Sequence, residues 1–145
     1  MAQLHTMMAP VLALITWTFV MFFWMYATRI PAMQKAGVDP AKIKGKETYG
    51  LLAAIPPKVG WIADNYNHLH EQPTLFYALC TYSFLVGVKD DLNIGLAWAY
   101  VAIRIVHSLV QAIGNFVPVR FVIFGIGSLV LLAITVRNVW AVVVS

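Results

Sequence analysis

The sequence has 145 residues, of which 61% are hydrophobic and only 11% carry a formal charge, and its net charge is +4. A soluble domain carries about 25% charged residues, so the composition excludes a soluble fold and predicts an integral membrane protein. The length fits one domain of four spans joined by short loops. The basic residues gather in one loop rather than along a face, so we expect no nucleic-acid partner. The single cysteine, Cys80, excludes a disulfide framework.

Four apolar segments predict an all-α, four-helix membrane bundle that makes up one domain, residues 1–145. The predicted spans are at about residues 7–28, 60–88, 92–115 and 119–143. Each can cross about 30 Å of hydrocarbon at a rise of about 1.5 Å per residue. We expect Pro73 to kink the second helix just above Glu71, and Asp91 to cap the third helix.

The loop between the first two spans, residues 29–59, holds most of the basic side chains. They are Arg29, Lys35, Lys42, Lys44, Lys46 and Lys58. Asp39 and Glu47 are the acidic residues that oppose them in this loop. The positive-inside rule therefore predicts that the loop is cytoplasmic and that both termini lie on the non-cytoplasmic side. We expect a multi-pass protein of a bacterial inner membrane, surrounded by lipid.

Two polar groups interrupt the apolar spans. Glu71 lies in the polar stretch that opens the second span, where an ionisable group indicates a functional site. In the third span, polar residues recur at i, i+4, i+7 and i+11, which is one helix face. These residues are Tyr100, Arg104, His107 and Gln111. Counting along each helix places Glu71 and Arg104 at a similar depth, and since neither charge is tolerable alone in hydrocarbon, we expect them to pair.

One interpretation of that pair is a structural link between two helices. However, His107, Gln111, Arg29 and Arg120 lie toward the same side of the membrane, which is more polar chemistry than such a link requires. We therefore predict a cationic, amide-rich crevice that opens to the cytoplasm and suits a small anionic ligand.

Two segments resemble a known family. The run Asn67-His-Leu-His-Glu71-Gln-Pro73-Thr-Leu-Phe-Tyr77 is similar to the second-helix motif of the MAPEG family, the membrane-associated proteins in eicosanoid and glutathione metabolism. The run Arg104-Ile-Val-His107-Ser-Leu-Val-Gln111, with the turn from Asn115 to Arg120, resembles the third helix and the following turn of that family, whose members include bacterial proteins and microsomal prostaglandin E synthase.

The resemblance implies a homotrimer that holds glutathione between neighbouring subunits as a cosubstrate and acts on lipophilic small molecules as a transferase, peroxidase or isomerase. It implies that glutathione is bound by Arg29, Asn67, His68, Glu71, His107, Gln111 and Arg120, and that Arg104 braces Glu71. A guanidinium favours the thiolate form of a thiol. Arg120, at a helix N-terminus, is therefore the expected catalytic residue, and no metal is expected.

The sequence departs from the family pattern at three positions. His68 stands where the family has an asparagine, Gln111 replaces a tyrosine, and Phe121 replaces a serine. These departures leave open a non-catalytic accessory or assembly subunit with the same fold. A haem or metal protein that uses His68, His70 and His107 is a further alternative, although residues two apart on a helix point to different sides.

Overall fold

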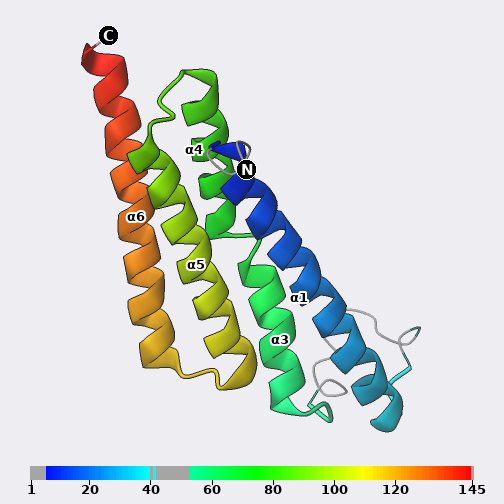
Figure 1. Cartoon of the computed structure of the whole chain (residues 1–145). Helices are drawn as coiled ribbons and strands as arrows, with labels where there is room; N and C mark the ends of the chain where they lie inside the picture. Colours follow the sequence, from blue (N-terminus) through cyan, green and yellow to red (C-terminus); the bar gives the residue numbers. More distant parts are fainter. Residues whose placement is uncertain (1–5, 40, 42–52, 145) are drawn as a thin grey trace.

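The computed structural model describes residues 6–39, 41 and 53–144, and the regular elements of these residues are helices. They are α1 (Met8–Lys35), α3 (Pro57–His68), α4 (Gln72–Leu85), α5 (Asp91–Ile113) and α6 (Val117–Val144). The elements α3 and α4 follow one another along the bundle beside α1 and α5 (Figure 1). Together, α3 and α4 take the place of one helix in a four-helix bundle, and this is the passage called the second one below. The predicted all-α fold class is confirmed.

Among the described residues, three helices are long and apolar enough to cross a membrane on their own: α1, α5 and α6, with 28, 23 and 28 residues. The other two, α3 and α4, have only 12 and 14 residues. A span needs about 20 residues, so neither of these two can cross alone. The second passage is therefore a broken helix rather than the single helix with a kink at Pro73 that was expected.

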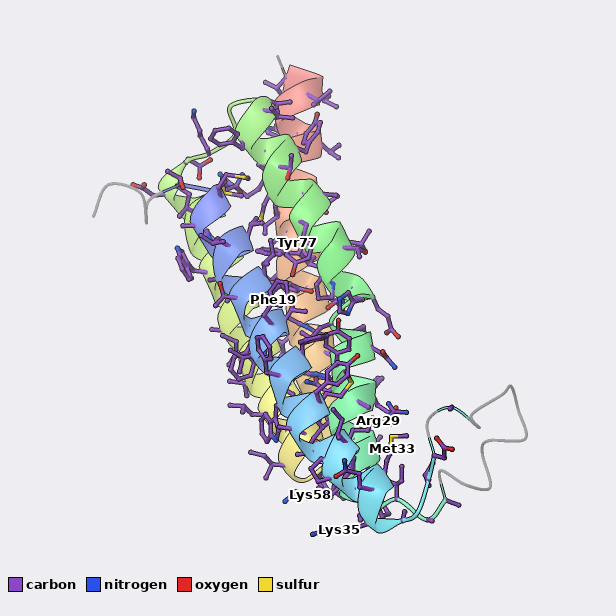
Figure 2. The ribbon with its side chains drawn as sticks, turned by 90° about the vertical axis from the view of Figure 1, so that its right-hand side faces the viewer. Phe19, Arg29, Met33, Lys35, Lys58 and Tyr77 are labelled. Carbon is purple, nitrogen blue, oxygen red and sulfur yellow. The ribbon has the colours of Figure 1, made fainter. Side chains whose placement is uncertain are left out.

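The first loop differs in extent from the prediction of residues 29–59. The helix α1 continues through Arg29 to Lys35, and α3 already begins at Pro57. Residues 42–52, with Lys42, Lys44, Lys46 and Glu47, lie outside the described residues. Figure 2 shows Arg29, Lys35 and Lys58 together at the end of the bundle where α1 ends and α3 begins. The start of α1 and the end of α6 lie toward the opposite end (Figure 1).

The helix α5 is the most buried element of the bundle. It packs most extensively against α6 and also contacts α3 and α1. Its N-cap is Asp90, one residue before the expected Asp91, and the Asp90 carboxylate accepts hydrogen bonds from the backbone N–H groups of Leu92 and Asn93 at 3.0 and 3.1 Å. These bonds satisfy two of the N–H groups that a helix start leaves free.

Polar side-chain pairs join the helices at several depths. Asn65 on α3 and Ser108 on α5 exchange hydrogen bonds of 2.6 and 2.9 Å, and Ser83 on α4 does the same with Asn138 on α6 at 3.1 and 2.8 Å. All four residues are buried. In a membrane, such pairs contribute to helix association because lipid offers polar groups no alternative partner.

Candidate functional site

The site begins at the break between α3 and α4. Pro73 has no backbone N–H and therefore cannot donate to the carbonyl of Leu69, four residues earlier. The chain ends α3 at His68, turns, and restarts as α4 at Gln72, with the proline in the first turn. The hydroxyl and backbone N–H of Thr74 both bond the carbonyl of Glu71, at 2.6 and 3.1 Å. The break therefore divides the second passage into α3 and α4, with the turn at 69–71 between them.

The polar face predicted on the third span points into the bundle. The relative exposures of Tyr100, Arg104, His107 and Gln111 are 0%, 1%, 1% and 3%. At one end of this face, the Tyr100 hydroxyl donates to the side-chain oxygen of Gln72 at 3.2 Å, and the amide of Gln72 donates to Ser128 at 2.7 Å. These contacts link the Tyr100 end of the polar face to α4 and α6 through Gln72.

Arg104 provides a hydrogen-bond donor to the C-terminal end of α3. Its Nη2 donates to the backbone carbonyl of His68 at 3.1 Å. The last carbonyls of a helix have no partner within the helix and carry partial negative charge, so a guanidinium is favourable there. Arg104 therefore fixes the position of the break relative to α5.

The direct pair between Arg104 and Glu71 is not formed within the described part of a single chain. Instead, Oε2 of Glu71 lies 2.5 Å from Nδ1 of His68. The physical reason is the helix break, which turns the Glu71 side chain outward, where it is 66% exposed. Both charged groups thus contact the same residue, His68, one at its backbone and the other at its ring. A pair between subunits stays a prediction.

Three rings from three helices meet beside this contact. The His68 ring lies 5.2 Å from that of His107 and stacks on Phe124 of α6 at 5.5 Å, with an interplanar angle of 25°. The rings of His107 and Phe124 are 6.3 Å apart. Phe124 was not predicted as a site residue. The signal for it was its place four residues after Arg120, which puts both on one face of α6.

Arg120 is oriented by the turn that precedes it. Asn115 has a positive φ of 47°, a conformation that asparagine tolerates better than most residues. Its backbone N–H bonds the carbonyl of Val110 at 2.8 Å, and its side-chain oxygen accepts a hydrogen bond from Nη1 of Arg120 at 2.5 Å. Asn115 therefore ends α5 and also holds the guanidinium of Arg120.

Several buried polar atoms around these rings have no hydrogen-bond partner among the described residues. They are Nε and Nη1 of Arg104, Nδ1 of His107, Oε1 of Gln111 and Nε of Arg120. Leaving one buried polar atom unsatisfied costs about 1–3 kcal/mol. A group of them in a native structure requires an explanation such as a ligand. Most of these atoms are guanidinium donors, which fit an anionic ligand. The free oxygen of Gln111 is an acceptor, which fits a ligand that also carries amide hydrogens.

Two predicted residues stand apart from this cluster. Arg29 lies on α1 and lines a cleft of about 250 Å³ that includes Asp64 of α3. Asn67 is exposed on α3, and its backbone carbonyl accepts from the N–H of His70 at 2.9 Å. His70 does not join the other histidines either, because its Nδ1 bonds the carbonyl of Tyr66 at 2.9 Å.

An apolar groove of about 530 Å³ lies between α4 and α6, next to the cluster. Its lining includes Gln72, Leu75, Ser128, Leu131 and Thr135. Gln72 directly follows Glu71 in the chain, and the Ser128 hydroxyl bonds the Phe124 carbonyl at 2.9 Å. The same segments thus line the polar cluster and the apolar groove.

Comparison with known proteins identifies one family. The family model described as "MAPEG family" matches residues 7–140, which include all the residues of this cluster. Comparisons with curated proteins and with solved structures returned no match.

Proposed function

Because the chain belongs to the MAPEG family, we propose that it is a membrane-bound, glutathione-dependent transferase or peroxidase that acts on lipophilic substrates. Family membership supports a glutathione-related function of an integral membrane protein in general. The specific site that we propose is formed by His68, Glu71, Arg104, His107, Gln111 and Arg120. The observation that carries the proposal is the set of unpartnered buried atoms on Arg104, His107, Gln111 and Arg120.

These residues match the chemical groups of glutathione. Its two carboxylates suit the free guanidinium nitrogens of Arg104 and Arg120, because a charged hydrogen bond is about twice as strong as a neutral one. Its peptide N–H groups suit the free amide oxygen of Gln111. Its ammonium group suits the Glu71 carboxylate, which is 66% exposed and therefore accessible.

Arg120 is the residue that we propose for activation of the thiol. A free thiol has a pKa of about 8.5, and a neighbouring cation lowers this pKa by stabilising the thiolate. Arg120 lies in the first turn of α6, where the helix dipole adds positive potential. One guanidinium nitrogen is held by Asn115, and Nε is free. Arg120 can therefore present positive charge in a fixed place.

The lipophilic substrate would approach through the groove between α4 and α6. The lining of this groove is mostly leucine, alanine and tyrosine, and Gln72 and Ser128 are polar residues within it. A substrate that dissolves in the bilayer could enter such a groove sideways and meet the polar cluster at these two residues. This arrangement accounts for a glutathione site within a membrane protein.

We further propose that the protein works as a homotrimer in a bacterial inner membrane, as one domain over residues 1–145. Arg29 supports the assembly, because it stands apart from the cluster in its own chain. If Arg29 binds glutathione, it must reach the cluster of a neighbouring copy. The basic end that carries Arg29, Lys35 and Lys58 (Figure 2) would face the cytoplasm, with both termini on the other side.

A titration of the detergent-purified protein with glutathione tests the proposal. We expect saturable heat in calorimetry and a rise in melting temperature, since a ligand that binds only the folded state stabilises it. We also expect conjugation of glutathione to a lipophilic electrophile, or reduction of a lipid hydroperoxide. Binding without either activity would favour the accessory-subunit alternative, to which Gln111 and Phe121 already point. Absence of binding would contradict the proposal.

A further inference from the structure

The imidazole of His68 has a fixed tautomer. A carboxylate can only accept hydrogen bonds, and Oε2 of Glu71 lies 2.5 Å from Nδ1 of His68. The hydrogen of the neutral ring must therefore be on Nδ1, which leaves a lone pair on Nε2. The other side of the residue is fixed as well, because Arg104 bonds its backbone carbonyl at 3.1 Å.

The ring is also held in one orientation. It stacks on Phe124 at 5.5 Å and lies 5.2 Å from His107, and its side chain is only 20% exposed. Phe124 shares a face of α6 with Arg120. The carboxylate of Glu71 is more open, at 66% exposure. The arrangement is a carboxylate that orients a histidine whose ring lies beside those of His107 and Phe124.

From this geometry we infer that His68 is the general base that accepts the proton of the glutathione thiol, with Glu71 as its positioning residue. The inference rests on the proposed function and extends it. His68 accepts the thiol proton at Nε2. The S–H bond breaks, its electron pair stays on sulfur, and the ring becomes an imidazolium whose charge the Glu71 carboxylate balances. Arg120 stabilises the negative charge on sulfur.

The other two histidines nearby lack this arrangement. Nδ1 of His107 has no partner among the described residues, so no carboxylate fixes its tautomer. Nδ1 of His70 bonds the Tyr66 carbonyl, and the residue lines a different cleft, between α1 and the α3–α4 break. Among the described residues, the charged groups beside the cluster are Arg104 of α5, Arg120 of α6 and Glu71; the two arginines cannot accept a proton, and the Glu71 carboxylate already bonds Nδ1 of His68. His68 is therefore the base that the geometry selects.

The test compares His68→Gln with His70→Gln, a matched substitution two residues away. Binding of glutathione is measured by calorimetry, with S-methylglutathione as a ligand that has no thiol proton. Formation of the thiolate is followed by its ultraviolet absorbance after rapid mixing. Because His68 belongs to the proposed binding site, we expect His68→Gln to weaken binding of both ligands by the same factor. At saturating glutathione, it should form the thiolate more slowly than the wild type by about 10²–10⁴-fold. His70→Gln should behave as the wild type.

Glu71→Gln provides a second variant, because its exposed side chain is not needed for packing. It should slow thiolate formation, although its affinity for glutathione also falls. Unchanged thiolate formation in His68→Gln and Glu71→Gln would overturn the inference but leave the proposed function intact. Weaker binding of both ligands to His68→Gln with an unchanged rate of thiolate formation at saturation would likewise overturn it, by reducing His68 to a binding residue. A wild type that does not bind glutathione would contradict the proposed function itself.

Discussion

Arg104 donates a hydrogen bond to the backbone carbonyl of His68, so a buried guanidinium on α5 caps the C-terminal end of α3. This contact connects the two halves of the predicted site. It also explains why the chain tolerates a helix break within a membrane, since the broken backbone finds a partner inside the protein rather than in lipid.

Substitution of Arg104 should therefore destabilise the fold far more than substitution of Glu71. Arg104→Met leaves the His68 carbonyl without a partner in a buried place, which costs about 1–3 kcal/mol. Glu71→Gln removes the charge of an exposed group, and we expect less than about 1 kcal/mol. Unfolding of both variants in detergent by a chemical denaturant measures the difference. Equal losses would indicate that Glu71 is buried against Arg104 in the assembled protein.

Arg137 should contribute to stability at the opposite end of the bundle. Its Nε donates to the side-chain oxygen of Asn93 at 2.6 Å, and its Nη2 donates to the Asp90 carboxylate at 2.8 Å. Because the ion pair is partly exposed, Arg137→Ala should cost only about 1–2 kcal/mol. Denaturant unfolding would check this, and an unchanged midpoint would show that the contacts contribute nothing measurable.

The same end should give an acid-dependent contribution to stability. The pKa of Asp90 is lowered, mainly by the hydrogen bond from the backbone N–H of Asn93. Arg137 and the backbone N–H of Leu92 lower it further, and together these effects exceed the opposing effect of desolvation. A carboxyl whose folded-state pKa is depressed stabilises the fold above its unfolded pKa of about 3.9, and this contribution is lost as the pH falls through the folded pKa. Asp90→Asn should flatten the acid limb of the stability–pH curve. An identical acid limb in both proteins would refute the role of Asp90.

The Asn65–Ser108 pair should behave as a coupled unit. Ser108→Ala leaves a buried amide without its partner, whereas the double variant Asn65→Leu/Ser108→Ala removes both polar groups. A double-mutant cycle should give a coupling energy of about 0.6–2 kcal/mol. Strictly additive losses would mean that the two reciprocal hydrogen bonds, at 2.6 and 2.9 Å, contribute nothing to stability.

Asn115 should affect glutathione binding through Arg120. Asn115→Gly keeps the positive φ but removes the oxygen that accepts from Arg120, whereas Asn115→Ala adds backbone strain as well. Both variants should bind glutathione more weakly, and only the alanine variant should also melt at a lower temperature. Full affinity in Asn115→Gly would show that the orientation of Arg120 does not depend on this contact.

Much of the fold follows from the sequence because hydropathy and helical periodicity are local signals. The stripe from Tyr100 to Gln111 predicted a polar helix face, and all four of its residues are buried. The break after His68 was predicted only as a kink, since Pro73 shows where a hydrogen bond is lost but not how the chain turns afterwards.

The partners of the site residues were harder to predict. Helix depth predicted that Glu71 lies near Arg104, whereas the turn at 69–71 directs the carboxylate to the ring of His68. Phe124 and Asn115 carry no charge, so nothing in their chemistry marked them as site residues.

Calorimetric titration of glutathione into the wild type, Arg120→Ala and Arg137→Ala tests the central claim most directly. Both arginines lie on α6, but only Arg120 belongs to the cluster with unpartnered buried atoms. We expect saturable binding to the wild type and to Arg137→Ala, and none to Arg120→Ala at the same concentrations, with all three proteins folded. Absence of binding to the wild type, or equal affinities for the two variants, would contradict the proposed glutathione site.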